Sequence, residues 1–335
     1  MSNLTQFLPP GKTAPRIARM AVSNWQTRNA PAGTGTNWFG IAWNGTVFAG
    51  VSGTGVGNRA CTSPDGITWT SRTSAANNDW QGIAWNGTVF AAIASTGAGN
   101  RVMTSPDGIT WTGRTSAANY YWKAIAWNGT VFAAVAAADA VSNQTVMTSP
   151  DGITWTLRTG TTSAGWQAIT WNGTVFAAVG DGGVIMTSPD GITWTNRTSA
   201  AANSLRAIAW NGTVFAAVSA SGVGTRVQTS PDGITWTLRT SAADNAWVAI
   251  AWNGTVFAAI SNTGVGNRAM TSPDGITWTI RTSSIHNGDL ECIAWNGLGA
   301  GTTLLLPVAG TGTVFAAMSY DQVMTCHFSK FGSPT

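Results

Sequence analysis

The sequence predicts an all-β protein, a closed ring of seven blades with four antiparallel strands in each blade, and two repeated strings carry this prediction. A period of about 40 to 45 residues is typical of the blades of a β-propeller. The string Trp-Asn-Gly begins at seven positions: Trp43, Trp85, Trp127, Trp171, Trp210, Trp252 and Trp295. The string Ser-Pro-Asp-Gly-Ile-Thr-Trp begins at six: Ser63, Ser105, Ser149, Ser188, Ser230 and Ser272. Both strings recur at this period, so we predict a seven-bladed β-propeller.

Each repeat is predicted to contain four strands, a to d, joined by tight turns. In the second copy these strands cover 81–85, 88–93, 101–104 and 109–114. Asn86-Gly87 is the strongest short hairpin signal, because both central residues of a type I′ turn need positive φ. Ser105-Pro106-Asp107-Gly108 has the residue order that a type I turn favours. The turn aspartates are therefore predicted to be structural, since Asp in such a turn hydrogen-bonds nearby backbone: Asp65, Asp107, Asp151, Asp190, Asp232 and Asp274.

The seventh blade has no Ser-Pro-Asp-Gly string, which indicates that its fourth strand comes from the N-terminus. Trp25 and Arg28 have the same spacing as Trp69 and Arg72 near the end of the first copy. We therefore predict one propeller domain over residues 17–335, preceded by an N-terminal arm, 1–16. Residues 17–28 and 290–328 share the last blade, which carries an insertion at 298–310. This Velcro closure leaves no free sheet edges.

Composition excludes several classes of function. Charged residues make up 9% of the chain, and the net charge of +4 is spread over the repeats rather than clustered, so no nucleic-acid partner is expected. No run is long enough for a membrane-spanning helix, and no membrane insertion is expected. The first residues lack the apolar stretch of a signal peptide, which predicts a location in a virion or outside the cell after lysis. Cys61, Cys292 and Cys326 have no metal-ligand spacing and are predicted to be buried, with no metal or cofactor.

The string Ser-Pro-Asp-Gly-Ile-Thr-Trp resembles the Asp-box repeat of sialidases and related propellers, although here Asp65 and Gly66 are adjacent and the motif is one residue shorter. In that family the box is a structural turn remote from the catalytic pocket, so the resemblance implies blades and not hydrolysis. The Asn-Gly and Ser-Pro-Asp-Gly repeats, with the segment 2–11, also resemble bacteriophage tail and host-recognition proteins. That likeness implies a role in a phage particle.

Differences between the copies are concentrated on one predicted face. The a–b and c–d turns hardly vary, whereas the b–c loops vary in length and the d-to-a crossovers vary in content. Loops on a rigid scaffold are where recognition usually takes place. Several crossovers end in an aromatic residue beside Asn or Asp. This combination is typical of a sugar-binding site, where the ring covers an apolar sugar face and the amide or carboxylate binds hydroxyl groups. The candidate ligand-binding residues are Trp38, Asn78, Asp79, Trp80, Tyr120, Tyr121, Trp122, Trp166, Asp244 and Trp247. The alternative is that each Trp only caps the core between blades.

An enzyme is not expected. Glycoside hydrolysis needs two placed carboxylates or a tyrosine nucleophile with helpers, and the acids outside the turns belong to different blades. The sequence therefore favours a non-enzymatic recognition protein that binds glycans or a cell-surface receptor at several sites. The alternative is a structural or docking propeller that contacts other virion proteins, and a glycosidase is the least favoured reading. The oligomeric state is left open.

Overall fold

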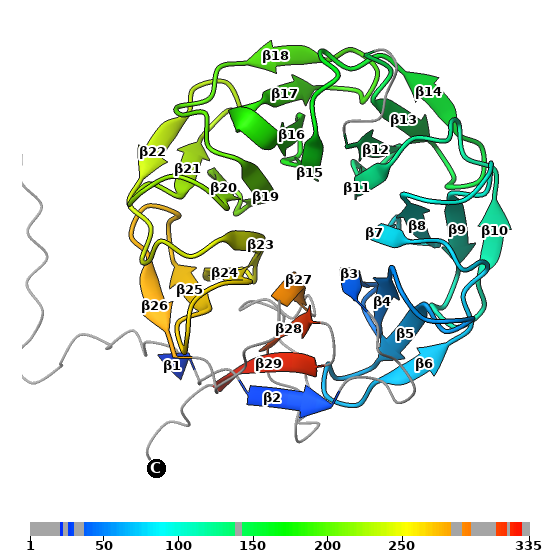
Figure 1. The fold of residues 1–335 in the computed structure, drawn as a ribbon, viewed down its shortest axis with the longest axis horizontal. Helices are drawn as coiled ribbons and strands as arrows, with labels where there is room; N and C mark the ends of the chain where they lie inside the picture. The colour runs from blue at the N-terminus through cyan, green and yellow to red at the C-terminus, as the bar shows by residue number, and fades with distance from the viewer. Residues whose placement is uncertain are drawn as a thin grey trace, which may run out of the picture.

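The computed structural model describes residues 21–22, 26–29, 37–137, 143–282, 290–295, 313–319 and 322–329, and its sheets stand around a central channel (Figure 1). Blade 1 contains β3 (Trp38–Trp43), β4 (Phe48–Ser52), β5 (Ala60–Ser63) and β6 (Thr70–Arg72), and blade 2 contains β7 (Trp80–Trp85), β8 (Phe90–Ala94), β9 (Val102–Ser105) and β10 (Thr112–Arg114). Blade 3 contains β11 (Trp122–Trp127), β12 (Phe132–Ala136), β13 (Val146–Ser149) and β14 (Thr156–Arg158), and blade 4 contains β15 (Trp166–Trp171), β16 (Phe176–Gly180), β17 (Ile185–Ser188) and β18 (Thr195–Arg197). Blade 5 contains β19 (Leu205–Trp210), β20 (Phe215–Ser219), β21 (Val227–Ser230) and β22 (Thr237–Arg239), and blade 6 contains β23 (Trp247–Trp252), β24 (Phe257–Ser261), β25 (Ala269–Ser272) and β26 (Thr279–Arg281).

The prediction of seven four-stranded blades is wrong, because the described residues form six such blades. The remaining sheet, here called the closing sheet, has five strands: β27 (Leu290–Trp295), β28 (Thr313–Ser319), β29 (Gln322–Ser329), β1 (Ala21–Val22) and β2 (Gln26–Asn29). Strand β29 has eight residues, twice the length of the third strand of a blade, so its edge accommodates both β1 and β2.

The predicted closure of the ring by the N-terminal segment is confirmed. Thr27 lies opposite Met324, and Arg28 lies opposite Val323, in an antiparallel pair of β2 with β29 (Figure 1). The predicted N-terminal arm, the insertion at 298–310 and Trp25 lie outside the described residues.

The Ser-Pro-Asp-Gly turns are held by their own side chains, the six turn aspartates among them. Asp107 Oδ1 accepts hydrogen bonds from Ile109 N at 2.8 Å, Thr110 N at 3.0 Å and Ser105 Oγ at 3.0 Å. Burial tends to raise the pKa of Asp107, but these hydrogen bonds outweigh it and lower the pKa below 3.8. The same contacts recur in every copy, at Asp65, Asp107, Asp151, Asp190, Asp232 and Asp274.

The a–b turns differ from the predicted type I′ hairpin. Gly87 has φ of +99°, but Asn86 does not have positive φ, and β8 begins only at Phe90. Asn86 instead uses its side chain, whose Oδ1 accepts hydrogen bonds from Thr88 N at 2.9 Å and Val89 N at 2.7 Å. The Asn-Gly string therefore specifies a four-residue turn capped by the Asn side chain.

Aromatic and aliphatic side chains fill the space between neighbouring blades. Trp80 and Phe90 of blade 2 are fully buried in a cluster that includes Ala49 and Val51 of blade 1. The Phe90 ring lies 4.6 Å from that of Trp85 and 6.4 Å from that of Trp111, between centroids. Equivalent clusters recur around the ring. Truncating such a buried aromatic to alanine typically costs about 3–5 kcal/mol.

The cysteine prediction is confirmed for two of the three thiols. Cys61 and Cys292 are buried in one cluster, where blade 1 meets the closing sheet, and both are free. Cys61 Sγ would lie 2.8 Å from a Cβ added to Gly50, and Met318 Sδ would lie 3.3 Å from it. The other blades have Ala at the position of Gly50, so the glycine makes room for these two sulfur-containing side chains. The Cys326 side chain lies outside the described residues.

Among the described residues, no helix is long and apolar enough to cross a membrane. The same residues contain no group of three or more His, Cys, Asp or Glu side chains that could hold a metal ion.

Candidate functional site

The five crossover tryptophans, predicted to stack on a sugar, are buried in this structure. Each is 0% exposed: Trp38, Trp80, Trp122, Trp166 and Trp247. A ring without accessible surface offers no face to a ligand. In three crossovers the indole N–H also donates to a carbonyl of the same crossover, at 3.0 to 3.1 Å. The alternative reading, that these rings cap the core between blades, describes their position.

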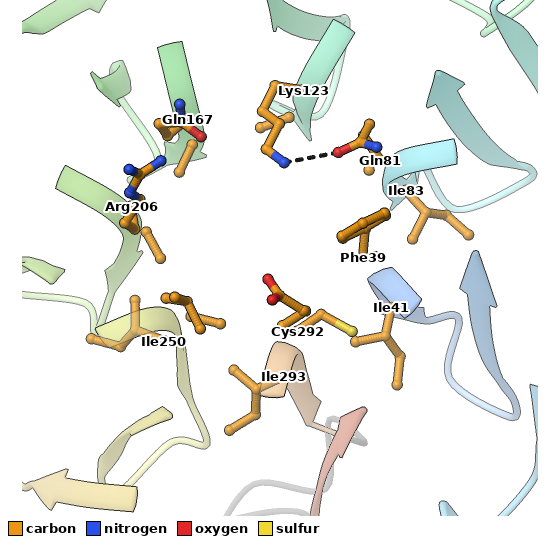
Figure 2. Close-up of a pocket in the computed structure, with 18 of the residues that line it drawn as sticks. Phe39, Ile41, Gln81, Ile83, Lys123, Gln167, Arg206, Ile250, Cys292 and Ile293 are labelled. Atoms are coloured by element: carbon orange, nitrogen blue, oxygen red, sulfur yellow. Dashed lines mark hydrogen bonds between the residues drawn. The ribbon is translucent and has the colours of Figure 1, made fainter. Parts of the chain in front are cut away.

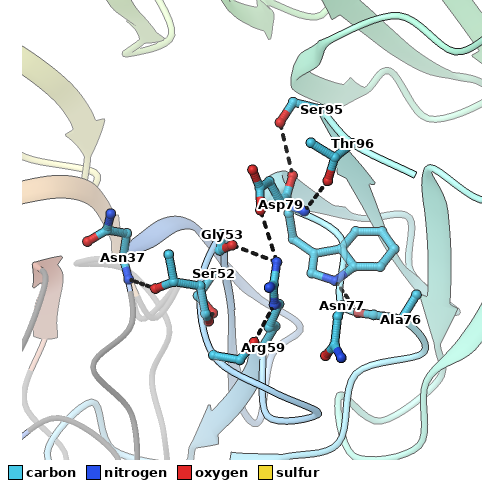
Figure 3. A network of polar contacts seen from close by, with 12 residues as sticks. Asn37, Ser52, Gly53, Arg59, Ala76, Asn77, Asp79, Ser95 and Thr96 are labelled. Atoms are coloured by element: carbon cyan, nitrogen blue, oxygen red, sulfur yellow. Dashed lines mark hydrogen bonds and ion pairs between the residues drawn. The ribbon is translucent and has the colours of Figure 1, made fainter. Parts of the chain in front are cut away.

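The polar candidates beside these tryptophans hold loops together. Asn78 is 7% exposed, and its Nδ2 donates to Asn100 O at 2.9 Å. Asp79 Oδ1 pairs with Arg59 Nη1 of the preceding blade at 2.9 Å, and that arginine also donates to Gly53 O and Gly55 O (Figure 3). These contacts join the b–c loop of blade 1 to the crossover that follows it.

The remaining candidates have mixed positions. Asp244 Oδ1 accepts from Gly224 N at 2.6 Å and lies 3.7 Å from Arg226 Nε, so it also fastens a loop to a crossover. Tyr120 packs against Trp122 with ring centroids 5.9 Å apart. Tyr121 is 45% exposed, and the Arg101 guanidinium lies 5.9 Å from its ring centroid. Tyr121 is thus the most exposed ring of the predicted set.

A second feature, which the sequence analysis missed, is a ring of side chains at the central channel. In every inner strand the pairing register shifts between the first and third residues, which marks the second as a β-bulge residue. A bulge re-aims a side chain and is common beside functional sites. We call these seven residues the bulge ring: Phe39, Gln81, Lys123, Gln167, Arg206, Val248 and Glu291.

The bulge ring lines a cavity of about 470 Å³ in the channel. Figure 2 shows Lys123 and Gln81 at one part of its wall, with Arg206 and Gln167 beside one another on neighbouring strands. Isoleucines and small residues of the same strands complete the lining. The ring follows the crossovers directly, so it lies at the end of the channel where the crossovers and b–c loops meet.

Polar contacts link neighbouring members of the bulge ring. Lys123 Nζ donates to Gln81 Oε1 at 2.8 Å, and it lies 5.3 Å from the centroid of the Phe39 ring. Asp181, in the short 3-10 helix η1 (Asp181–Gly183), accepts from Gln167 Nε2 at 2.8 Å through Oδ2. Asp181 Oδ1 lies 3.4 Å from Arg206 Nη2.

The electrostatics of Lys123 reflect its place in the channel wall. Burial lowers the pKa of its ammonium group from 10.5. The Glu291 and Asp181 charges act in the opposite direction, the Arg206 charge acts in the same direction, and the net shift is downward. The positive charge of Lys123 therefore lowers the stability of the folded protein.

A signal for the bulge ring was present in the repeats. The inner strands have Trp-Phe-Gly-Ile, Trp-Gln-Gly-Ile, Trp-Lys-Ala-Ile, Trp-Gln-Ala-Ile, Leu-Arg-Ala-Ile, Trp-Val-Ala-Ile and Leu-Glu-Cys-Ile, so their second position varies most. Lys123 is the only lysine in residues 37–282, and Glu291 is the only glutamate of the chain. Every other arginine in 37–282 recurs at an equivalent position, whereas Arg206 does not.

No family model and no curated protein match this chain. Solved structures do match it. Virginiamycin B lyase from Staphylococcus aureus superimposes with a TM-score of 0.73 at 11% identity, over 91% of this chain and 99% of that one. A chain of the mitotic checkpoint complex gives 0.67 at 12% identity, over 98% and 99%.

A third similar structure is that of YCF48 bound to D1 peptide, with a TM-score of 0.66 at 13% identity, over 93% of this chain and 98% of that one. Identities this low show the fold alone. The comparisons lend no support to the Asp-box or phage-tail resemblance. Together with the sheets around the channel, the structural likenesses show that this chain is a β-propeller repeat protein.

Proposed function

We propose that this chain is a non-enzymatic docking propeller that receives an extended segment of a protein partner at the bulge ring. The observation that carries the proposal is the variation of the bulge ring within inner strands that are otherwise nearly identical. The inner strand keeps its structure with six different residue types at these seven positions, so folding does not dictate which side chain stands there. Side chains that the scaffold does not need and that face a cavity are available for recognition.

Cavity size and chemistry support a small occupant. Ligand sites usually have volumes of about 300–1,000 Å³ with a few placed polar groups, and the channel cavity measures about 470 Å³. Phe39 and Val248 provide apolar contact, while Gln81 and Lys123 provide hydrogen-bond donors. Two of the similar propellers were solved with protein or peptide partners, one in the mitotic checkpoint complex and YCF48 with D1 peptide.

Catalysis and glycan binding are not part of this proposal. One similar structure is a lyase, but at 11% identity the likeness concerns the fold and not the activity. Glycan binding rested on the crossover tryptophans, which are buried. A role in a phage particle rested on sequence resemblance alone.

Selection from a random displayed peptide library tests the proposal. Peptides enriched on the wild-type protein are measured against Val248→Trp, which fills the channel, and against Thr88→Trp, which places the same side chain on an exposed a–b turn. We expect binding to weaken at least about tenfold, or about 1.4 kcal/mol, in the first variant and to be unchanged in the second. Enriched peptides that bind Val248→Trp as well as wild type, or a library without enriched peptides, would refute channel docking.

A further inference from the structure

Lys123 of the bulge ring uses only part of its bonding capacity within the described residues. Its ammonium carries three N–H donors, and its one hydrogen bond to a described residue is that to Gln81 Oε1. None of the ion pairs between described residues includes Lys123. The Phe39 ring at 5.3 Å gives it a weak cation–π contact. Lys123 therefore has donors to offer at the channel wall.

Gln81 adds further donors at the same place. An ammonium group can only donate, so the glutamine must turn its Oε1 toward Lys123 and its Nε2 away from it. The Gln81 Nε2 group then presents two N–H donors, and it makes no hydrogen bond within the described part of the chain. Figure 2 shows both side chains at the channel wall, joined by their hydrogen bond.

Carboxylates of the channel compensate the Lys123 charge only in part, since the pKa of the lysine is still lowered. The Asp181 carboxylate lies 3.4 Å from Arg206 and accepts a hydrogen bond from Gln167 at 2.8 Å, so it is engaged in blades 4 and 5. The charge of Glu291 also acts on Lys123, yet burial prevails and the pKa of the lysine is lowered. An added negative group beside Lys123 would offset the cost of keeping this ammonium charged.

We infer that Lys123 and Gln81 form a receptor for one carboxylate, supplied by an Asp or Glu side chain of the segment that occupies the channel. This inference rests on the proposed docking function. A carboxylate is acceptor-only and can accept from both donors with charge-assisted hydrogen bonds. A phosphate dianion fits less well, because the Asp181 and Glu291 carboxylates already stand against the Lys123 and Arg206 charges, and a dianion would add two negative charges instead of one.

The test uses glutamate capped as N-acetyl and N-methylamide, with capped glutamine as the neutral isostere, at constant ionic strength. The protein is labelled with 13Cε-lysine and observed by NMR, and Lys12 and Lys330 are reference signals in the same spectrum. We expect capped glutamate to shift the Lys123 signal saturably and to raise its titration midpoint, and capped glutamine to do neither. Equal responses to both compounds, or equal responses of all three lysines, would overturn the inference.

Two variants with the same charge change sharpen the test. Gln81→Glu places a carboxylate beside Lys123 within the protein, so we expect it to weaken capped glutamate at least about tenfold. Thr88→Glu adds the same charge on the exposed a–b turn of the same blade and should retain wild-type affinity. Wild-type affinity in Gln81→Glu would overturn the assignment.

Failure of this inference is distinguishable from failure of docking. If library peptides without acidic residues require the open channel, and capped glutamate leaves Lys123 unchanged, docking holds and the carboxylate receptor is refuted. If capped glutamate binds at Lys123 but no peptide requires the channel, the receptor is supported and segment docking is refuted.

Discussion

Removing one turn aspartate should destabilise the protein by an amount that depends on pH. Asp107→Ala deletes the oxygen that accepts hydrogen bonds from the backbone of Ile109 and Thr110. These N–H groups are near the surface and regain water in the variant, so the loss resembles that of a helix cap, about 1 kcal/mol. For a protein of this size we expect Tm to fall by about 2 °C at pH 7.

The sign of the pH dependence follows from the lowered pKa of Asp107. A carboxyl whose folded pKa lies below its unfolded value stabilises the fold fully well above pH 3.8, and this contribution is lost as the pH falls through the folded pKa. Wild type and Asp107→Ala should therefore differ at pH 7 and converge as the pH falls below 3.8 toward 2. All six turn aspartates have lowered pKa values, so the wild-type protein should lose stability steeply over the same window.

Thermal unfolding followed by circular dichroism at a series of pH values from 7 to 2 measures both effects. Ile109→Ala is the matched control in the same turn, because its side chain is 47% exposed and does not titrate. The difference between this control and wild type should not vary with pH. A Tm of Asp107→Ala equal to that of wild type at pH 7, or a deficit that persists undiminished at low pH, would show that the carboxylate is not what holds the turn.

Three further changes test other parts of the structure. Gly50→Ala should lower the free energy of unfolding by about 1–3 kcal/mol, because the added Cβ would lie 2.8 Å from Cys61 Sγ. Urea titrations should show that adding Cys61→Ala recovers part of this loss, and a single variant as stable as wild type would contradict the packing. Of Thr27→Pro and Arg28→Pro, only one should remove a ladder hydrogen bond to β29, since the backbone N–H groups of alternate residues in an edge strand face the partner. The free energies of unfolding of the two variants should therefore differ by about 1 kcal/mol, and equal Tm values would count against the pairing. Lys123→Met should stabilise the protein at pH 7, because burial lowers the pKa of Lys123 and the charged lysine destabilises the fold below that pKa. This gain in stability should vanish above pH 10.5, and a variant less stable than wild type at pH 7 would contradict the prediction.

The sequence predicted the parts of the fold that depend on local signals. The Ser-Pro-Asp-Gly and Asn-Gly strings placed every a–b and c–d turn of the six blades, and the spacing of Arg28 indicated the strand that pairs with β29. The closing sheet departed from the prediction because its fifth strand depends on the length of β29, which no turn signal marks. The φ of Asn86 was also mispredicted, since a side-chain cap and a positive φ satisfy the same string.

The candidate site was harder to predict, because it depends on pairing register. In the sequence Gln81 and Lys123 look like ordinary positions of an alternating strand, and only the shift in register reveals them as bulge residues. Trp80 and Trp122 were hard to predict for another reason. An aromatic at the end of a loop suits both a ligand site and a core, and sequence alone does not give its accessible surface.

Because β1 and β2 both pair with β29, the first and last residues of the described fold are interdependent. The ribosome makes the six regular blades before it makes β29, so the nascent chain carries them as an arc whose two ends still lack partners. Translation must finish before the N-terminal strands can join the sheet. A chaperone would therefore protect this protein most while the chain is still an open arc. A circular permutant, with the natural ends joined and a loop between two blades cut, would change the order in which the ring of blades is assembled.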